Sequence, residues 1–182
     1  MPALDFSPAL SRPDLLAAPV REALAAIDPT MQSQIRVTPI DATLADTAAF
    51  CEAYGVELAE SANCIVVAGT RGDVTTYAAC MVLATTRLDV NGTVRRLLGA
   101  RRASFAPMDD AVALTGMEYG GITPIGLPDD WALLIDARVA ALPSAIVGAG
   151  IRGAKLALPG HVLATLPNAQ VIDDLGREAP VA

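Results

Sequence analysis

The stretch Thr115–Pro128, which reads TGMEYGGITPIGLP, tells most about the fold of this chain. It combines four glycines with two prolines, at Gly116, Gly120, Gly121, Gly126, Pro124 and Pro128. Glycine permits a positive φ or a close approach to the backbone, whereas proline fixes φ and removes a donor. The pattern therefore predicts a stiff loop that can hold backbone N–H groups in fixed directions, as binding of an anion or a developing oxyanion requires. An ordinary tight turn is the alternative.

Mixed helices and strands are predicted on both sides of this loop. Helical spacing, capping residues and terminal glycines predict helices at residues 19–27, 43–54, 90–98, 108–115 and 161–166. Short apolar runs predict strands at 34–37, 64–68, 75–84, 133–135, 145–147 and 156–158. The Arg-Gly-Asp triplet at 71–73 is interpreted as the turn of a hairpin. The tail after Asp174 is expected to be frayed.

The order of motifs around the loop resembles that of the YbaK/prolyl-tRNA-synthetase-associated domain family. Gly120–Pro124 is similar to the GxxxP loop of that family. The other matching motifs are RLDV at 87–90, LLG at 97–99, residues 108–116, WALLID at 131–136, GAG at 148–150 and KLAL at 155–158. Together they extend from about residue 44 to residue 166.

The resemblance implies a mixed α+β fold, with a curved, mostly antiparallel central sheet flanked by helices. It also implies three regions: an N-terminal extension at 1–40 packed on the domain, an editing domain at 41–170 and a tail at 171–182.

Proteins of this family hydrolyse mischarged aminoacyl-tRNA, so the resemblance implies a trans-acting deacylase for the ester of a small wrong amino acid. Such an ester is already activated, and the protein needs to position a water and to stabilise the oxyanion. The expected catalytic residues are Gly120, Gly121 and Asp136, with substrate-binding residues Asn63, Thr123, Pro124, Gly148 and Gly150. An aspartate occurs in relatives at the place of Asp136, although the sequence alone allows equally that it caps a helix at 137–142. No cofactor is expected.

Asn63 departs from the family pattern, because deacylating members carry a lysine at this place. A charged hydrogen bond contributes about 1.5–3 kcal/mol and a neutral one about 0.5–1.5 kcal/mol. The alternative hypothesis is therefore a non-catalytic module that binds tRNA, a synthetase or an amino acid. The only lysine of the chain is Lys155, in a later predicted strand.

Charge is distributed unevenly along the chain. The net charge is −7, yet residues 87–102 carry +4, which leaves −11 for the rest. The arginines of this window are Arg87, Arg95, Arg96, Arg101 and Arg102. A local arginine cluster can contact tRNA phosphates while the remaining surface repels other polyanions, although a solvated helix face would give the same pattern.

Other chemistries find little support in the sequence. The single histidine, His161, has no nearby partner and is interpreted as exposed and structural. Cys51, Cys64 and Cys80 lack metal-ligand spacing, so no metal is expected and reduced thiols in a cytoplasmic protein fit best. A thiol enzyme using Cys64 lacks a visible base. Phosphate-binding glycine motifs are also missing.

At 182 residues the chain is long enough for one domain with a sizeable core. Hydrophobic residues make up 53% and aromatic ones 4%, so aliphatic side chains are expected to fill that core. No apolar run is long enough for a bilayer, and no signal peptide is predicted at the start. The expected partners are aminoacyl-tRNA and an aminoacyl-tRNA synthetase, with no membrane, and the protein is expected to be a monomer or homodimer.

Overall fold

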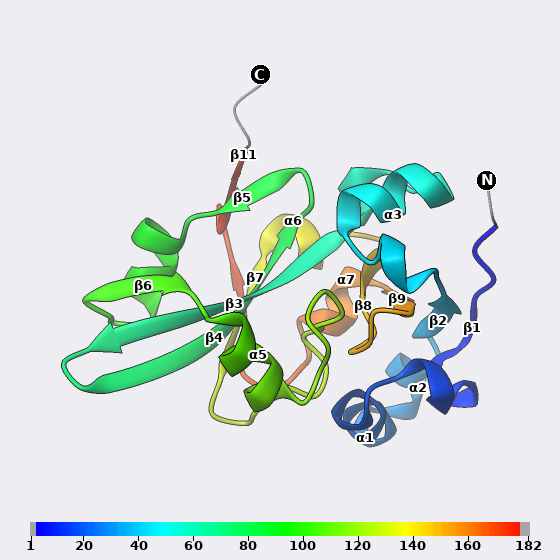
Figure 1. Ribbon diagram of the computed structural model, residues 1–182, viewed down its shortest axis with the longest axis horizontal. Helices are drawn as coiled ribbons and strands as arrows, with labels where there is room; N and C mark the ends of the chain where they lie inside the picture. Colours follow the sequence, from blue (N-terminus) through cyan, green and yellow to red (C-terminus); the bar gives the residue numbers. More distant parts are fainter. Residues whose placement is uncertain (1–2, 179–182) are drawn as a thin grey trace.

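The computed structural model describes residues 3–178, which form mixed sheets with helices around them (Figure 1). The larger sheet has the strand order β10–β7–β4–β3–β6. Its strands, in that order, are Ala169–Ile172, Ala132–Asp136, Val74–Leu83, Ala62–Arg71 and Arg102–Phe105. Strands β3 and β4 form a long antiparallel hairpin, whereas β4–β7 and β7–β10 pair in parallel.

A second sheet has the order β1–β2–β9–β8, and all its pairs are antiparallel. Its strands, in that order, are Ser7–Pro8, Arg36–Pro39, Ala154–Leu158 and Ala145–Gly148. A two-stranded sheet joins β5, Thr86–Leu88, to β11, Gly176–Glu178. The antiparallel pairs outnumber the parallel ones, so the predicted mixed, mostly antiparallel α+β fold is confirmed.

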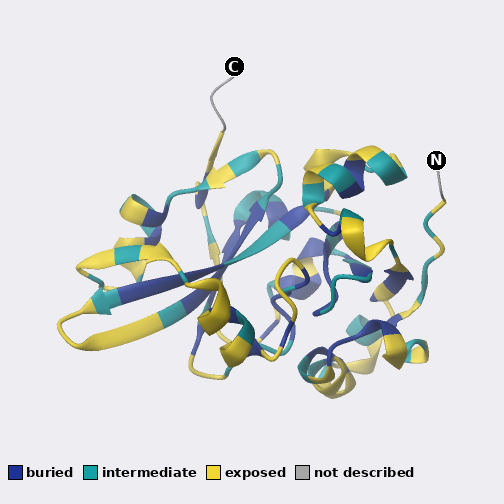
Figure 2. Ribbon diagram, in the orientation of Figure 1, coloured by how far each residue is buried: buried dark blue, intermediate teal, exposed yellow. Residues whose placement is uncertain are grey.

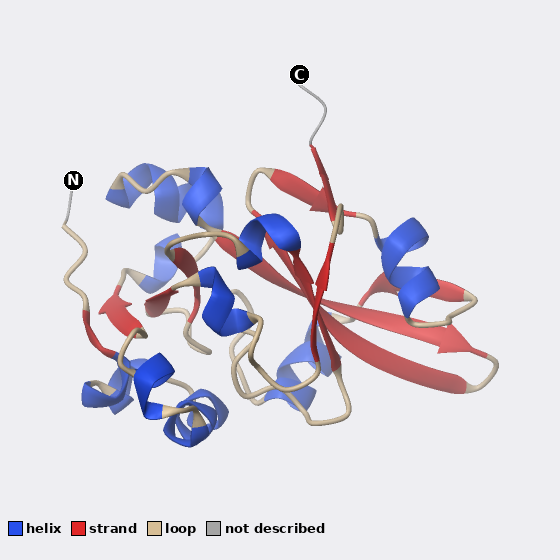
Figure 3. Cartoon of the chain, turned by 180° about the vertical axis from the view of Figure 1, so that it is seen from behind, coloured by secondary structure: helices blue, strands red, loops and turns tan. Residues whose placement is uncertain are grey.

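Short helices surround these sheets. The α-helices are α1 at Ala18–Ala26, α2 at Pro29–Gln32, α3 at Thr47–Tyr54, α4 at Arg95–Leu97, α5 at Met108–Thr115, α6 at Ala137–Ala140 and α7 at Gly160–Leu163. Single 3₁₀ turns lie at Ala9–Ser11, Pro13–Leu15, Ala42–Leu44 and Leu58–Glu60, and a π turn lies at Val90–Val94. Seen from behind, the larger sheet crosses the middle of the molecule and several helices gather toward the N-terminal side (Figure 3).

Helix α3 shows how local sequence sets an element that borders the site. Its predicted start at Thr43 is corrected to Thr47, because the Asp46 carboxylate accepts hydrogen bonds from Ala48 N–H and Ala49 N–H and so caps the helix. Residues Ala42–Leu44 form a separate 3₁₀ turn. The predicted end is confirmed, since Gly55 lies in the left-handed region with φ 68°.

The core joins the N-terminal segment to the sheets. Val20 and Leu24 of α1 lie in one buried cluster with Ile135 of β7 and Leu156 of β9. Strand β2 of this segment also pairs with β9 over four residues. Figure 2 shows buried residues concentrated along the central strands, whereas the tip of the β3–β4 hairpin is exposed. Residues 3–40 are therefore part of the same packed body as the cleft described below.

The expectation of a frayed end is wrong as far as Glu178. Strand β11 pairs with β5 in register from Gly176 opposite Leu88 to Glu178 opposite Thr86. Residues 179–182 lie outside the described part. Within residues 3–178, no helix is both long enough and apolar enough to cross a membrane.

Candidate functional site

A cleft of about 700 Å³ lies between the start of α3, strand β3 and the predicted glycine loop. Asp46, Thr47 and Phe50 line it from the side of α3. Asn63 to Val66 of β3 line a second side. The glycine loop contributes Tyr119 and Gly120, and the second sheet contributes Gly148 and Lys155. Polar and apolar side chains thus meet in one concave site, as is typical of small-molecule sites.

The glycine loop is held rigidly against the segment that follows β8. Glu118 N–H donates to Gly150 C=O at 2.9 Å, and Gly150 N–H donates to Gly121 C=O at 2.8 Å. The Glu118 carboxylate accepts a 2.7 Å hydrogen bond from Arg152 N–H. The Arg152 guanidinium donates to the carbonyls of Tyr119 and Ala42, both at 3.1 Å. These bonds confirm the predicted stiff loop.

Two glycines make the close approach possible. A Cβ on Gly148 would lie 2.3 Å from the Gly121 carbonyl oxygen and 2.6 Å from that of Ile122. A Cβ on Gly121 would lie 2.5–2.8 Å from backbone atoms of Ile151. Neither position therefore tolerates a side chain unless the loop moves away from β8.

The polar side chains of the cleft are tied to the start of α3. Thr47 Oγ1 donates to Asn63 Oδ1 at 2.6 Å. Lys155 Nζ donates to Ala45 C=O at 3.0 Å, although only 6% of this residue is exposed. Burial lowers the pKa of the Lys155 ammonium, and the charges of Cys51 and Asp46 act in the opposite direction.

The structure brings some of the predicted site residues to the cleft. Asn63, Gly120 and Gly148 line it. The Gly121 N–H donates to Glu118 C=O at 2.9 Å, so it is engaged within the loop. Three more of the predicted residues, Thr123, Pro124 and Gly150, lie behind the loop. Thr123 and Pro124 are buried, and Gly150 packs toward Ala17 and Val20 with φ +84°. These three support the loop and do not line the cleft.

Asp136 does not reach the cleft. It caps α6 by accepting from Arg138 N–H at 2.9 Å, and its carboxylate is also paired with the Arg138 side chain at 2.8 Å. Its second oxygen accepts from Gly176 N–H at 2.7 Å. Burial alone would raise the pKa of Asp136, but the hydrogen bonds from Arg138 and Gly176 together lower it below its usual value. Asp136 therefore caps a helix, which is the alternative that the sequence left open.

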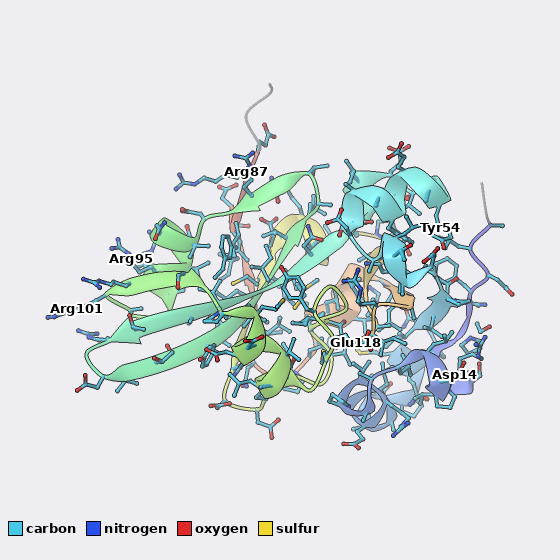
Figure 4. All side chains as sticks on the ribbon, viewed as in Figure 1. Asp14, Tyr54, Arg87, Arg95, Arg101 and Glu118 are labelled. Carbon is cyan, nitrogen blue, oxygen red and sulfur yellow. The ribbon has the colours of Figure 1, made fainter. Side chains whose placement is uncertain are left out.

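The five arginines predicted to bind tRNA are all exposed. Figure 4 shows Arg95 and Arg101 at the end of the molecule away from Asp14, whereas Arg87 lies apart from them on the upper side, in β5. Arg95 and Arg96 lie in α4, and Arg102 begins β6, which pairs with β3. None of the five arginines is among the residues that line the cleft.

The thiols and the histidine offer no nucleophilic site. Burial raises the pKa of Cys64 to about 12, so the thiolate that catalysis would need is disfavoured at neutral pH. His161 is exposed in α7, as expected. Among residues 3–178, no cluster of three or more His, Cys, Asp or Glu side chains is arranged to hold a metal ion.

Sequence reasoning missed most of the polar cleft. Asp46 and Thr47 were interpreted only as helix residues, and Arg152 was not singled out. Lys155 was noted as the only lysine, in an otherwise apolar strand, but the sequence left open whether it reaches the site. Its contact with Ala45 spans 110 residues and has no local sequence pattern.

Fold and cleft together define a small α+β protein with a polar pocket under a rigid glycine loop. A family model described as the aminoacyl-tRNA editing domain matches residues 41–166. The chain therefore belongs to the aminoacyl-tRNA editing domain family, as the resemblance implied.

Solved structures support the same fold. The chain is 23% identical to a protein described as a candidate trans-editing enzyme for prolyl tRNA synthetase, with a TM-score of 0.72, covering 90% of this chain and 99% of that one. A hypothetical protein is 22% identical, with a TM-score of 0.74, covering 87% of this chain and 99% of that one. At such identities the likeness establishes the fold. A search of curated protein sequences gives no match.

Proposed function

We propose that the protein is a trans-acting deacylase that hydrolyses the ester between a small wrong amino acid and the terminal ribose of tRNA. The observation that carries the proposal is the open cleft under the glycine loop, in a chain that belongs to the aminoacyl-tRNA editing domain family. The structural neighbour described as a candidate trans-editing enzyme for prolyl tRNA synthetase is consistent with it.

The proposed hydrolysis needs no nucleophilic side chain, because the ester is already activated. A water adds to the ester carbonyl carbon, the bond from that carbon to the ribose oxygen breaks, and the ribose oxygen takes up a proton. The products are the free amino acid and an uncharged tRNA end. Gly120 is the glycine of the loop that lines the cleft, and we assign the oxyanion donor to its N–H. Asn63 would place the substrate, since it lies on the facing wall.

Selectivity among amino acids would come from the size of the amino-acid side chain. The cleft walls include Phe50, Ile122 and Ile146, and a rigid pocket discriminates best by excluding side chains that are too large. The loop that carries Gly120 is fixed by the hydrogen bonds of Glu118, Gly150 and Arg152, so the walls resist expansion.

The direct test is a panel of tRNAs charged with correct and incorrect small amino acids, each incubated with the pure protein. Ester loss is followed against a control without protein. We expect selective hydrolysis of one mischarged species. Intact esters across the whole panel would contradict the proposal.

A non-catalytic binding module is the second candidate, and the neutral Asn63 favours it. The Asn63 amide is neutral and therefore adds no charge to the cleft. Its oxygen already accepts a hydrogen bond from Thr47. If the wild type leaves every ester intact while Asn63→Lys hydrolyses one of them, the binding module is the better description. If both hydrolyse the same ester, the neutral side chain suffices for the reaction.

A further inference from the structure

Lys155 is the only lysine of the chain, and the fold buries it at the edge of the cleft. Its backbone lies in β9 opposite Gly148 of β8 and Thr38 of β2, in the middle of the second sheet. Lysine is rarely buried unless its ammonium has partners, because removing a charge from water is costly. Its position therefore calls for an explanation beyond packing.

The contacts of the ammonium inside the protein are few. One hydrogen bond goes to Ala45 C=O at 3.0 Å, and the ring of Phe50 lies 5.3 Å from Nζ. An ammonium carries three donors, so one carbonyl and one aromatic face leave hydrogen-bonding capacity toward the cleft. Among residues 3–178, no carboxylate lies within ion-pair distance of Nζ.

Strand register explains why this ammonium faces an open space. Ser61 of the segment before β3 bridges Ile146 of β8 in parallel, and two residues further along each chain come Asn63 and Gly148. Gly148 in turn pairs with Lys155. Asn63 and Gly148 therefore lie where β3 comes close to the edge strand of the second sheet, and Gly148, which pairs with Lys155, has no side chain between the ammonium and the cleft. All three line the cleft.

We propose that the Lys155 ammonium donates a hydrogen bond to the acyl oxygen of the aminoacyl group bound in the cleft, so that the cleft selects ligands with an aminoacyl carbonyl. This inference rests on the proposed function for the identity of the ligand. It assigns the ligand-binding cation to Lys155 of β9, whereas the Arg152 guanidinium, which also lines the cleft, is held by the carbonyls of Tyr119 and Ala42.

The sole lysine makes the proposal directly observable. Untagged protein labelled with lysine carrying ¹³Cε and ¹⁵Nζ gives one side-chain signal, which needs no assignment. The probe is 3′-alanylamino-3′-deoxyadenosine, whose amide replaces the ester and is not hydrolysed. We expect the Lys155 signal to shift as the probe is added. An unchanged signal at a probe concentration that saturates binding would overturn the proposal.

Variants separate a contact with ligand from support of the fold. Met is unbranched, similar in length to Lys and uncharged, so Lys155→Met removes the cost of a buried charge and is expected to fold. It should weaken probe binding, and kcat/KM on the hydrolysed tRNA, about tenfold or more, as loss of a charged hydrogen bond predicts. Lys155→Arg should retain part of both. The exposed Arg21→Ala on α1 is the control and should change neither.

The pH profile gives a readout that a merely structural lysine would not move. The titratable groups near Lys155 are the Asp46 carboxyl and the Cys51 thiol on the α3 side and the Arg152 guanidinium before β9. Burial lowers the pKa of Lys155, so the ammonium is lost at a lower pH than for an exposed lysine, as the pH rises through that lowered value. Protein-dependent binding and hydrolysis should fall there in the wild type, and Lys155→Arg should not show the fall.

The outcomes distinguish this inference from the proposed function. Hydrolysis by the wild type and equally by Lys155→Met would leave the deacylase standing and overturn the role of Lys155. No hydrolysis across the panel, with the probe bound and the Lys155 signal shifted, would overturn the deacylase and support the lysine contact. Neither hydrolysis nor a shifted signal would overturn both.

Discussion

At the scale of single residues, Gly148 decides whether the loop can reach the sheet. Gly148→Ala would place a methyl group 2.3 Å from the Gly121 carbonyl oxygen. We expect a loss of about 1–3 kcal/mol in the free energy of unfolding, typical of overpacking, measured by urea denaturation. The matched control is Gly153→Ala, whose Cβ would meet only the Ile40 carbonyl oxygen at 4.0 Å. Equal stability of the two variants would contradict the packing described here.

The same closeness changes the expectation for Gly121. Gly121 was expected to be a catalytic residue, and Gly121→Val is the substitution that would test this role. Because its side chain would meet the Ile151 backbone at 2.5–2.8 Å, the loop would have to shift, so loss of activity in that variant would not identify an oxyanion donor.

Individual residues also show where sequence reasoning ends. Asn63, Gly120 and Gly148 were predicted at the site and do line the cleft, since each lies within a motif whose position in the fold is fixed by its neighbours. Asp136 was also predicted at the site. A carboxylate directly before a helix gives the same sequence pattern whether it faces a ligand or caps the helix. Lys155 contacts Ala45 across 110 residues, and local patterns do not encode such contacts.

At the scale of elements, strands with an apolar run were predicted even when short, as for β2 and β8, whereas short strands with several exposed residues were not. The β3–β4 hairpin has an apolar run on each side of a turn, and both arms were predicted. Strands β5, β6, β10 and β11 have three or four residues each and include several exposed positions. These segments are strands because a partner strand completes their hydrogen bonds. Their conformation is therefore determined by tertiary pairing and not by the local sequence.

Asp136 joins three of these elements, and it predicts an acid-sensitive stability. Its carboxylate binds Arg138 of α6 and the backbone of Gly176 in β11. Since its pKa is lower in the folded state, its contribution is present above the unfolded value of about 3.9 and is lost as the pH falls through the folded value. Asp136→Asn should lower the free energy of unfolding at pH 7 by about 1.5–3 kcal/mol.

The difference between wild type and Asp136→Asn should shrink when urea denaturation is repeated near pH 3. The control is Asp14→Asn, whose carboxylate pairs with Arg12 at an exposed site and should matter much less. A gap between wild type and Asp136→Asn that is the same at both pH values would argue against the ionised network.

At the scale of the whole molecule, charge and cleft are placed at different parts of the surface. The net charge of −7 opposes nonspecific binding of polyanions, whereas the arginine window at residues 87–102 carries +4. Arg95 and Arg101 of this window lie at the end of the molecule that carries the hairpin, and Arg87 lies apart from them on β5 (Figure 4). In the proposed deacylase, the 3′ end of a tRNA would lie in the cleft while its backbone phosphates meet these arginines.

This arrangement predicts how tRNA affinity depends on salt. Each phosphate contact that is lost reduces the slope of log K against log salt by about 0.7–0.9. The double variant Arg95→Ala/Arg96→Ala should bind tRNA more weakly at low salt, with a slope shallower by about 1–2, while hydrolysis of a saturating substrate changes little. Arg12→Ala/Arg21→Ala makes the same change in net charge on the other side of the molecule and serves as the control. If both double variants flatten the slope equally, total charge governs binding, and the arginine window is an ordinary solvated surface.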